Sequence, residues 1–245
     1  MHTKLFLLFI LAGLCGCQVL AGGEAPGTAA GLAEPKALFT LAFIPIDWQS
    51  GGEAFEAEAR RQAEYFVHES GMEAYFEVSI VVLEEGPQNI SLGSDGLVRE
   101  FVRAAQGRVA ADRYIGLTDG DLVDENISDM AGWTDGPGSL GVVVEAGNEK
   151  LLAHELGHTF GLCDEYNYSD WSQQDRSYPG GCPNPYPRDC PRLITEEIIC
   201  IGQRTEDGRF SLMGPAGLDG DYGYNVKSLK HLGRVFKGYR SEKRR

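Results

Sequence analysis

The chain has 245 residues, of which 42% are hydrophobic and 24% charged, and its formal net charge at pH 7 is −14. A charge this negative disfavours nucleic acid as a partner, because a polyanion is repelled by an acidic surface. About 200 residues follow the N-terminal segments described next, and that length suits one domain with a sizeable core rather than two.

The N-terminal residues predict export from the cytoplasm. A short charged start is followed by an apolar run, residues 5–14, that is too short to span a membrane comfortably. The letters L-C-G-C at residues 14–17 resemble a bacterial lipobox, which implies a signal peptide of residues 1–16 and a lipid on the sulfur of Cys17. A signal peptide cut near Ala21 is the alternative.

Residues 17–37 are predicted to be a lipid-anchored flexible tether, because residues 18–37 are mostly Ala, Gly, Pro and Glu with few large apolar side chains. The folded domain is predicted over residues 38–240. We therefore expect a monomer of the bacterial cell envelope that touches the membrane only through its N-terminal lipid, or a secreted protein if lipidation does not occur.

Apolar periodicity in the domain predicts strands that alternate with helices. Residues 37–46 are a continuous apolar run, typical of a central strand. Residues 53–70 follow with helical spacing that ends at Gly71. Further along the chain, the same patterns predict a strand at 75–83, a helix at 96–106, strands at 114–118 and 140–145, a short edge strand at 130–134, a helix from 148, a short helix or strand at 193–199 and a last helix at 226–236. This order predicts an α/β fold with a mixed twisted sheet.

The helix that begins at Asn148 carries the motif H-E-x-x-H in residues 154–158. His154 and His158 are four residues apart, so both can point a ring nitrogen at one ion about 2 Å away. Glu155 lies about 100° further round the helix, off the ligand face but close enough to hold a water and take its proton. The spacing therefore predicts two zinc ligands and a general base.

A catalytic zinc needs a third protein ligand and an open fourth position. Gly161 can adopt a left-handed conformation that ends the helix and turns the chain back, which brings Asp164 to the metal as a carboxylate ligand. A later glutamate, Glu196 or Glu197, is the alternative third ligand and would correspond to a gluzincin-type site. That alternative leaves Gly161 and Asp164 without a role.

Residues 154–164 resemble the metzincin pattern H-E-x-x-H-x-x-G-x-x-H, with Asp in place of the last His as in snapalysin-type secreted proteases. Residues 161–166 are similar to the G-L-x-D-E-Y of the IgA-peptidase type, and S-L-M-G-P at 211–215 fits the metzincin Met-turn. The resemblance implies a zinc-dependent endopeptidase with one catalytic zinc. The upper part of the domain, residues 38–161, would hold the zinc helix. The lower part, residues 162–240, would place Met213 below the metal.

The resemblance also implies how a protein or peptide substrate is held. An extended substrate would pair with the edge strand at 130–134, and Tyr222 or Tyr224 would reach the reacting carbonyl, although a packing role suits either tyrosine as well. A different class of function is a binding module, which would be either an anchored pseudo-protease that holds a peptide or a surface protein whose zinc only stiffens the fold. The intact Glu155 argues against it, because a site that only binds does not need a base.

Four cysteines of the predicted domain follow the active helix. In an exported chain they predict two disulfides, with three pairings allowed, that brace a loop-rich lower part: Cys163, Cys182, Cys190 and Cys200. Cys163 as a zinc ligand is the alternative. The aspartates of residues 119–129 suggest calcium, but Val123 occupies the third ligand position of an EF-hand loop, so a solvated loop is predicted instead.

Overall fold

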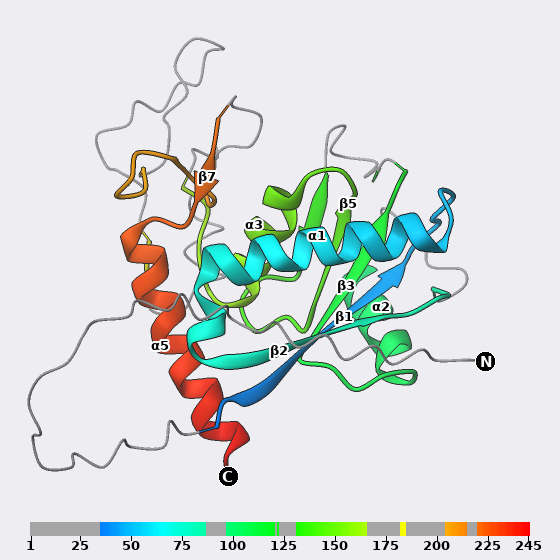
Figure 1. Ribbon diagram of the computed structural model, residues 1–245, viewed down its shortest axis with the longest axis horizontal. Helices are drawn as coiled ribbons and strands as arrows, with labels where there is room; N and C mark the ends of the chain where they lie inside the picture. The colour runs from blue at the N-terminus through cyan, green and yellow to red at the C-terminus, as the bar shows by residue number, and fades with distance from the viewer. Residues whose placement is uncertain are drawn as a thin grey trace, which may run out of the picture.

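The computed structural model describes residues 35–86, 97–120, 122, 131–165, 182–184, 204–214 and 220–245. Within them, one five-stranded sheet carries helices on both faces (Figure 1). Its strands are β1 (Ala37–Pro45), β2 (Phe76–Val82), β3 (Arg113–Thr118), β4 (Gly132–Thr134) and β5 (Gly141–Glu145). The helices are α1 (Gly52–Ser70), α2 (Leu97–Gln106), α3 (Glu149–Thr159) and α5 (Val226–Lys243), with the short elements η1 (Met72–Ala74), β6 (Phe210–Ser211) and β7 (Tyr222–Gly223).

The sheet has the order β2-β1-β3-β5-β4 and is mainly parallel. Only β4 runs antiparallel to its neighbour, with Gly132 opposite Val144 and Thr134 opposite Val142. The predicted mixed α/β sheet is confirmed, and so is the edge position of the strand predicted at residues 130–134.

Side chains alternate between two cores because successive residues of a strand face opposite sides of the sheet. In β1, Phe39, Leu41 and Phe43 pack in the core shared with α1, α3 and α5. The neighbouring Ala42 and Ile44 face the second core, which α2 covers. Both faces of the central strands are therefore buried, which explains why the sequence of β1 is continuously apolar.

The zinc helix of the sequence analysis is α3, which follows directly after β5. The side chain of Asn148 caps its first turn by accepting a hydrogen bond from the backbone N–H of Lys150, at 3.2 Å. Leu152 and Leu156 are fully buried and fix the helix against the sheet and α1. The opposite side of α3 is left to carry the polar residues of the motif.

Arg113, at the start of β3, holds the other end of α3 and was not predicted. It is almost fully buried, donates from Nε to the hydroxyl of Thr159 at 3.1 Å, and donates from Nη2 to the hydroxyl of Tyr239 at 3.0 Å. Its guanidinium carbon lies 4.4 Å from the ring centroid of Phe160. A cation at this place also complements the partial negative charge at the C-terminus of a helix.

The last helix is longer than predicted. The apolar pattern ended it at residue 236, whereas α5 continues to Lys243. Tyr239 stabilises the additional turns because its ring packs against Phe39 and Phe160, and the ammonium of Lys243 binds the carboxylate of Asp112 at 2.7 Å. The basic residues after 236 are therefore largely helical rather than an irregular tail.

Some predictions fall outside the described residues. These are the signal peptide and most of the tether, the segment 193–199, and most of the acidic loop 119–129. After α3, the described regular elements are β6, β7 and α5, and a disulfide joins Cys163 to Cys182, as expected of a loop-rich, disulfide-braced lower part. None of the described helices is long and apolar enough to cross a membrane.

Candidate metal centre

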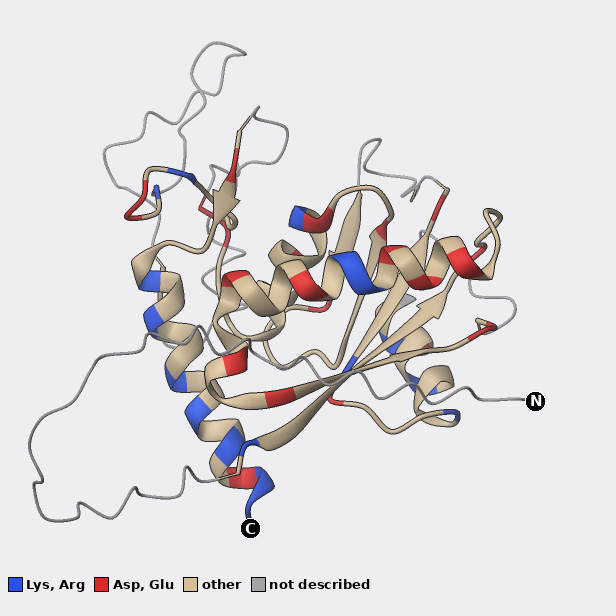
Figure 2. Ribbon diagram, viewed as in Figure 1, with Lys and Arg blue, Asp and Glu red and all other residues tan. Residues whose placement is uncertain are grey.

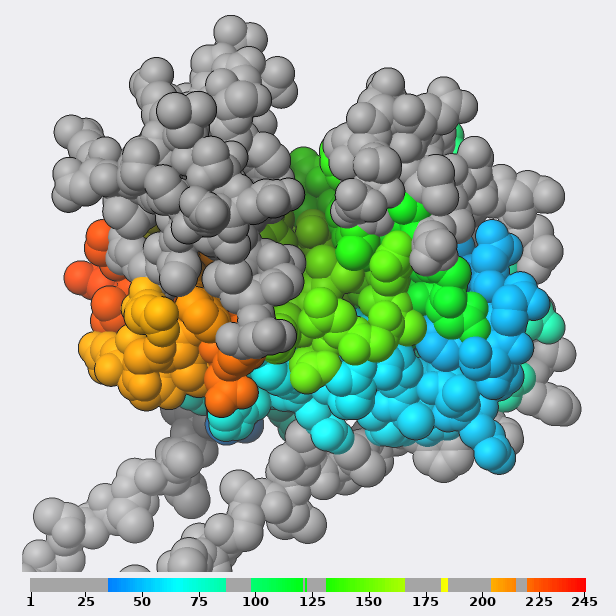
Figure 3. Space-filling model, turned by 90° about the horizontal axis from the view of Figure 1, so that it is seen from above, coloured from blue at the N-terminus to red at the C-terminus, as the bar shows by residue number. Residues whose placement is uncertain are grey.

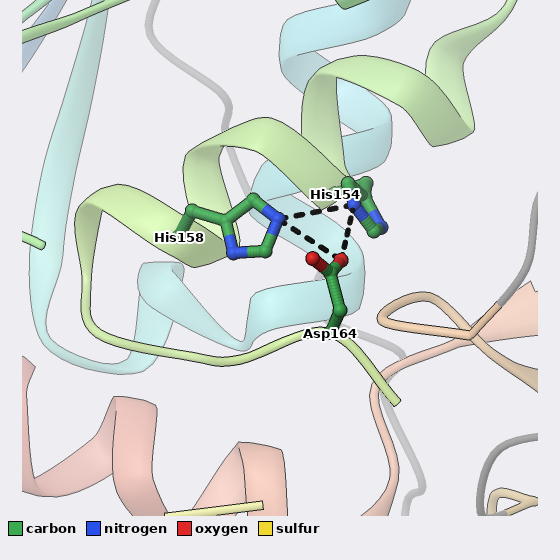
Figure 4. Close-up of side chains that lie close together, drawn as sticks. All are labelled: His154, His158 and Asp164. Atoms are coloured by element: carbon green, nitrogen blue, oxygen red, sulfur yellow. Dashed lines mark hydrogen bonds and ion pairs between the residues drawn. The ribbon is translucent and has the colours of Figure 1, made fainter. Parts of the chain in front are cut away.

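His154 and His158 point their rings at a common point on the polar side of α3 (Figure 4). Their Nε2 atoms are 3.1 Å apart and the ring planes are nearly perpendicular, at 88°. Both side chains are largely buried. The helical spacing thus produces the pair of convergent nitrogens that the sequence predicted.

Asp164 completes a group of three ligand atoms. Its Oδ1 lies 3.1 Å from Nε2 of His154 and 3.2 Å from Nε2 of His158. The chain reaches this place because Gly161 has a φ of 90°, the left-handed conformation that the sequence argument required. Three donors at these separations fit around one zinc ion at about 2.0–2.2 Å from each, so the residues present suit the metal.

Two backbone carbonyls orient the imidazoles. Nδ1 of His154 lies 2.7 Å from the carbonyl oxygen of Leu212, and Nδ1 of His158 lies 2.9 Å from that of Leu162. A carbonyl can only accept a hydrogen bond, so each Nδ1 must carry the proton. In a neutral ring this tautomer leaves the lone pair on Nε2, where a metal needs it.

The charges of the group explain its proton affinities in the metal-free protein. Burial lowers the pKa of His154, but the hydrogen bond and charge of Asp164 outweigh it and raise that pKa to about 9. Burial opposes ionisation of Asp164, yet the positive charge of His158 and the hydrogen bonds from both imidazoles hold the pKa of that carboxyl well below its usual range. Protons thus occupy the group where a divalent cation would bind.

Glu155 lies beside the metal group and against the edge strand. It is only 8% exposed, and burial raises the pKa of its carboxyl above the ordinary value, although the two imidazoles oppose this. Gly132 of β4 leaves room for it, since a Cβ at that position would be 2.9 Å from Cγ of Glu155. A carboxyl with a raised pKa is a stronger base once it is ionised.

Met213 packs directly under the zinc helix. It is fully buried, and a Cβ on Gly157, between the two histidines, would lie 2.7 Å from its sulfur. The preceding Leu212 supplies the carbonyl that orients His154. The segment that resembles a Met-turn therefore packs against α3 next to the two histidines, and a Met-turn role for Met213 stays a prediction.

A buried carboxylate next to Asp164 was not predicted. Glu165 is fully buried, and its Oε1 accepts hydrogen bonds from the side-chain amides of Asn184, at 2.9 Å, and Asn225, at 2.7 Å. Its backbone N–H donates to the carbonyl of Met213 at 2.6 Å. Glu165 thus joins the chain after α3 to three distant segments, and only tertiary contacts reveal this role.

The disulfide between Cys163 and Cys182 adds to the same junction. The side chain of Asn184, two residues after Cys182, accepts from the backbone N–H of Cys163 at 2.9 Å and donates to its carbonyl at 2.7 Å. A disulfide-bonded sulfur cannot also serve as a thiolate ligand, so the alternative of Cys163 as a zinc ligand is wrong. Cys190 and Cys200 lie outside the described residues.

The two tyrosines proposed for the reacting carbonyl contact the zinc helix in different ways. Tyr224 is buried and its hydroxyl donates to the carbonyl of Ala153. The ring of Tyr222 lies 4.3 Å from the ammonium of Lys150, which also donates to Gly220. Figure 3 shows the chain around β6 and β7 beside α1 and α3. These contacts support the packing role, and a role at the carbonyl stays a prediction.

Other residues could be considered as the third zinc ligand in place of Asp164. Glu196 and Glu197 lie outside the described residues. His231, which the sequence analysis does not assign to the metal, points Nε2 at the carbonyl of Phe160 at 2.8 Å and so supports the turn at Gly161. Among the described residues, the group of His154, His158 and Asp164 is the one set of three that can hold a metal.

Comparisons with protein-family models and with curated proteins found no match. Among solved structures, archaemetzincin from Methanopyrus kandleri is 17% identical with a TM-score of 0.44, over 81% of this chain and 96% of that one. Metalloproteinase-II from Bacteroides fragilis is 16% identical with a TM-score of 0.41, over 60% of this chain and 48% of that one. A chain of a chaperone–substrate complex is 12% identical with a TM-score of 0.40, over 82% and 39%. All three TM-scores are below 0.5, so a function must be inferred from this chain's own side chains.

Proposed function

We propose that the protein is a zinc-dependent endopeptidase that hydrolyses peptide bonds of proteins outside the cytoplasm. The observation that carries this proposal is the convergence of His154, His158 and Asp164, with donor atoms 3.1–3.2 Å apart, beside the buried Glu155. Structural zinc usually takes a closed set of four ligands rich in cysteine, whereas catalytic zinc takes three protein ligands and leaves one position open. The group matches the second pattern.

Each residue of the site has a defined task in this reaction. His154, His158 and Asp164 would hold the zinc ion, which when bound polarises the scissile carbonyl and makes water more acidic. Glu155 accepts the proton of the attacking water and later passes a proton to the leaving amine. The buried surroundings that raise the pKa of Glu155 suit it to both transfers.

The substrate lies along the edge strand in this proposal. The outer edge of β4 is not paired with another described strand, and an extended peptide can add to such an edge by main-chain hydrogen bonds. Gly132 of β4 packs against the Glu155 side chain, so a peptide on this edge passes close to the base. The exposed ring of Trp133 offers an apolar contact on the same strand.

Two alternatives make different demands on the residues. A gluzincin-type site needs Glu197 as the third ligand, but Asp164 already stands within 3.2 Å of both histidines. An anchored pseudo-protease needs no base, but Glu155 is present and has space beside β4. Both observations favour the peptidase with Asp164 as a ligand.

The base can be tested by Glu155→Gln. This variant should keep about one zinc per chain but lower turnover by at least ~10²-fold, the scale of a lost general base. Casein cleavage with and without a chelator measures activity, and atomic absorption measures zinc. Loss of the metal or full activity in the variant would remove Glu155 from the proposed role, and an inactive parent enzyme would favour the pseudo-protease.

The third ligand can be tested by comparing Asp164→Ala with Glu197→Ala. The first should weaken zinc binding far more, because it removes a bond to the metal, and Asp164→His should restore part of it. The zinc content that each variant keeps after dialysis against increasing concentrations of chelator ranks the variants by zinc affinity. The gluzincin alternative predicts the reverse order.

A further inference from the structure

Basic residues recur along the length of α5 (Figure 2). Lys227, Lys230, Arg234 and Lys237 follow one another at three- and four-residue spacings, which places them along one side of the helix. All four are exposed. The opposite side of α5 is buried in the core through Ser228, Leu232 and Phe236.

This basic row contrasts with the charge of the whole chain. Eight of the 22 lysines and arginines fall in residues 226–245, against one of the 36 acidic residues. None of Lys227, Lys230, Arg234 and Lys237 forms an ion pair with a carboxylate among the residues that the structure describes, whereas Lys243 binds Asp112. The row is thus an exposed cationic surface on an otherwise acidic protein.

The first turns of α5 add exposed apolar side chains to this surface. Val226 is 53% exposed and Leu229 is 40% exposed, and both belong to the few large hydrophobic residues that the described surface leaves open. Cations together with exposed apolar groups on one helix are typical of helices that lie on a membrane surface.

The position of α5 relative to the start of the domain points to the same partner. At the C-terminal end of α5, Lys243 donates to the carbonyl of Leu38 at 2.7 Å and Arg244 donates to the carbonyl of Pro35 at 2.9 Å. The chain therefore enters the domain beside this end of the helix. An N-terminal anchor would keep α5 near the membrane.

We propose that the outward face of α5 docks the domain on a membrane surface rich in anionic lipids. Each basic residue near such a surface strengthens binding by about fivefold, so a row of four has a large combined effect. The acidic remainder of the protein would be repelled, which sets the orientation of the docked domain. Nucleic acid is the competing polyanion, but an acidic protein with one basic helix offers it little further contact.

The test uses the full chain with Cys17→Ser, so that no lipid contributes to binding. Its partition onto vesicles of phosphatidylglycerol and phosphatidylcholine in equal parts is measured by co-sedimentation, with pure phosphatidylcholine vesicles as the reference. Binding to the anionic vesicles should be strong at about 0.1 M salt and weak at about 1 M, where the Debye length falls to about 3 Å.

Two matched variants assign the binding to α5. Lys230, Arg234 and Lys237 changed together to Gln should lower the vesicle partition coefficient by roughly 50-fold or more. Arg99, Arg103 and Arg204, which are exposed elsewhere, changed together to Gln should change it by less than about fivefold. Co-sedimentation requires no activity, so the vesicle result does not depend on the peptidase proposal. If the protein is a peptidase, both variants should cleave a soluble peptide at the parent rate.

Several outcomes would overturn the docking proposal. These are equal loss of binding in the two variants, equal binding to neutral and anionic vesicles, and no binding at low salt. Tighter binding to duplex DNA than to the anionic vesicles would assign the surface to nucleic acid instead.

Discussion

Replacing Gly132 by Ala would test the placement of the Glu155 carboxylate separately from metal binding. Gly132 is not among the glycines with positive φ, so the strand backbone itself accepts a side chain. The new methyl group would lie 2.9 Å from Cγ of Glu155, 3.1 Å from its Oε1 and 3.1 Å from Cδ1 of Leu151. Carbon atoms in contact are about 3.5–4.0 Å apart, so the Glu155 side chain must move by roughly 0.5–1 Å.

A displacement of this size determines how far the catalytic rate should fall. Misplacing a catalytic group by about 1 Å can cost on the order of 10²-fold, so kcat/KM should fall by roughly 10- to 100-fold. Crowding of this kind should lower the free energy of unfolding by about 1–3 kcal/mol. Zinc content should not change, because none of the atoms that the methyl group meets belongs to a metal ligand. Gly238→Ala is the matched control, since a Cβ there meets no atom within 4 Å.

A double-mutant cycle shows whether the effect passes through Glu155. Peptide cleavage is measured for Gly132→Ala, for Glu155→Gln and for the combination of both, and zinc is measured by atomic absorption. If Gly132 acts only by giving space to the base, the double variant is no slower than Glu155→Gln alone. Full activity of Gly132→Ala, loss of its zinc, or a further loss of rate in the double variant would refute this explanation.

Three further predictions concern other parts of the chain. Gly157→Ala should lower the free energy of unfolding by about 1–3 kcal/mol because its Cβ would lie 2.7 Å from the sulfur of Met213, and the same change should cost less in a chain that already carries Met213→Ala; thermal denaturation measures both. In the metal-free protein the pKa of His154 is raised to about 9, so its stabilising contribution should be complete below the unfolded value of about 6.5 and lost as pH rises through about 9. Denaturant titrations across that range should show the decline without zinc and not with it. Cys17→Ser should move the protein from the membrane fraction to the soluble exported fraction on immunoblots, and unchanged membrane association at high salt would contradict lipidation at this residue.

The parts of the site that the sequence predicted are those set by local geometry. His154 and His158 are four residues apart on a helix, and that spacing alone brings their nitrogens together. Gly161 is three residues further on, where only a turn of the chain can return Asp164 to the same point. The short edge strand predicted at residues 130–134 is β4, Gly132–Thr134, at the edge of the sheet.

The parts that the sequence could not show depend on contacts between distant segments. Arg113 resembles any charged residue at the start of a strand, yet it is buried and holds the end of α3. Gly132 resembles any glycine near a turn, and its role appears only when β4 is placed beside Glu155. The length of α5 also escaped prediction, because Tyr239 stabilises its last turns by packing against residues more than 70 positions earlier.

Asp164 and Glu165 show how two adjacent carboxylates acquire different roles from their surroundings. Asp164 faces the two histidines, whereas the neighbouring Glu165 is fully buried in the interior. There its Oε1 accepts hydrogen bonds from the amides of Asn184 and Asn225, which offset the cost of burying a polar side chain. Because the backbone N–H of Glu165 also donates to the carbonyl of Met213, movement of the segment around Met213 would be transmitted directly to Asp164. The pair therefore links the position of the Asp164 carboxylate to the packing of the chain around Met213, Asn184 and Asn225.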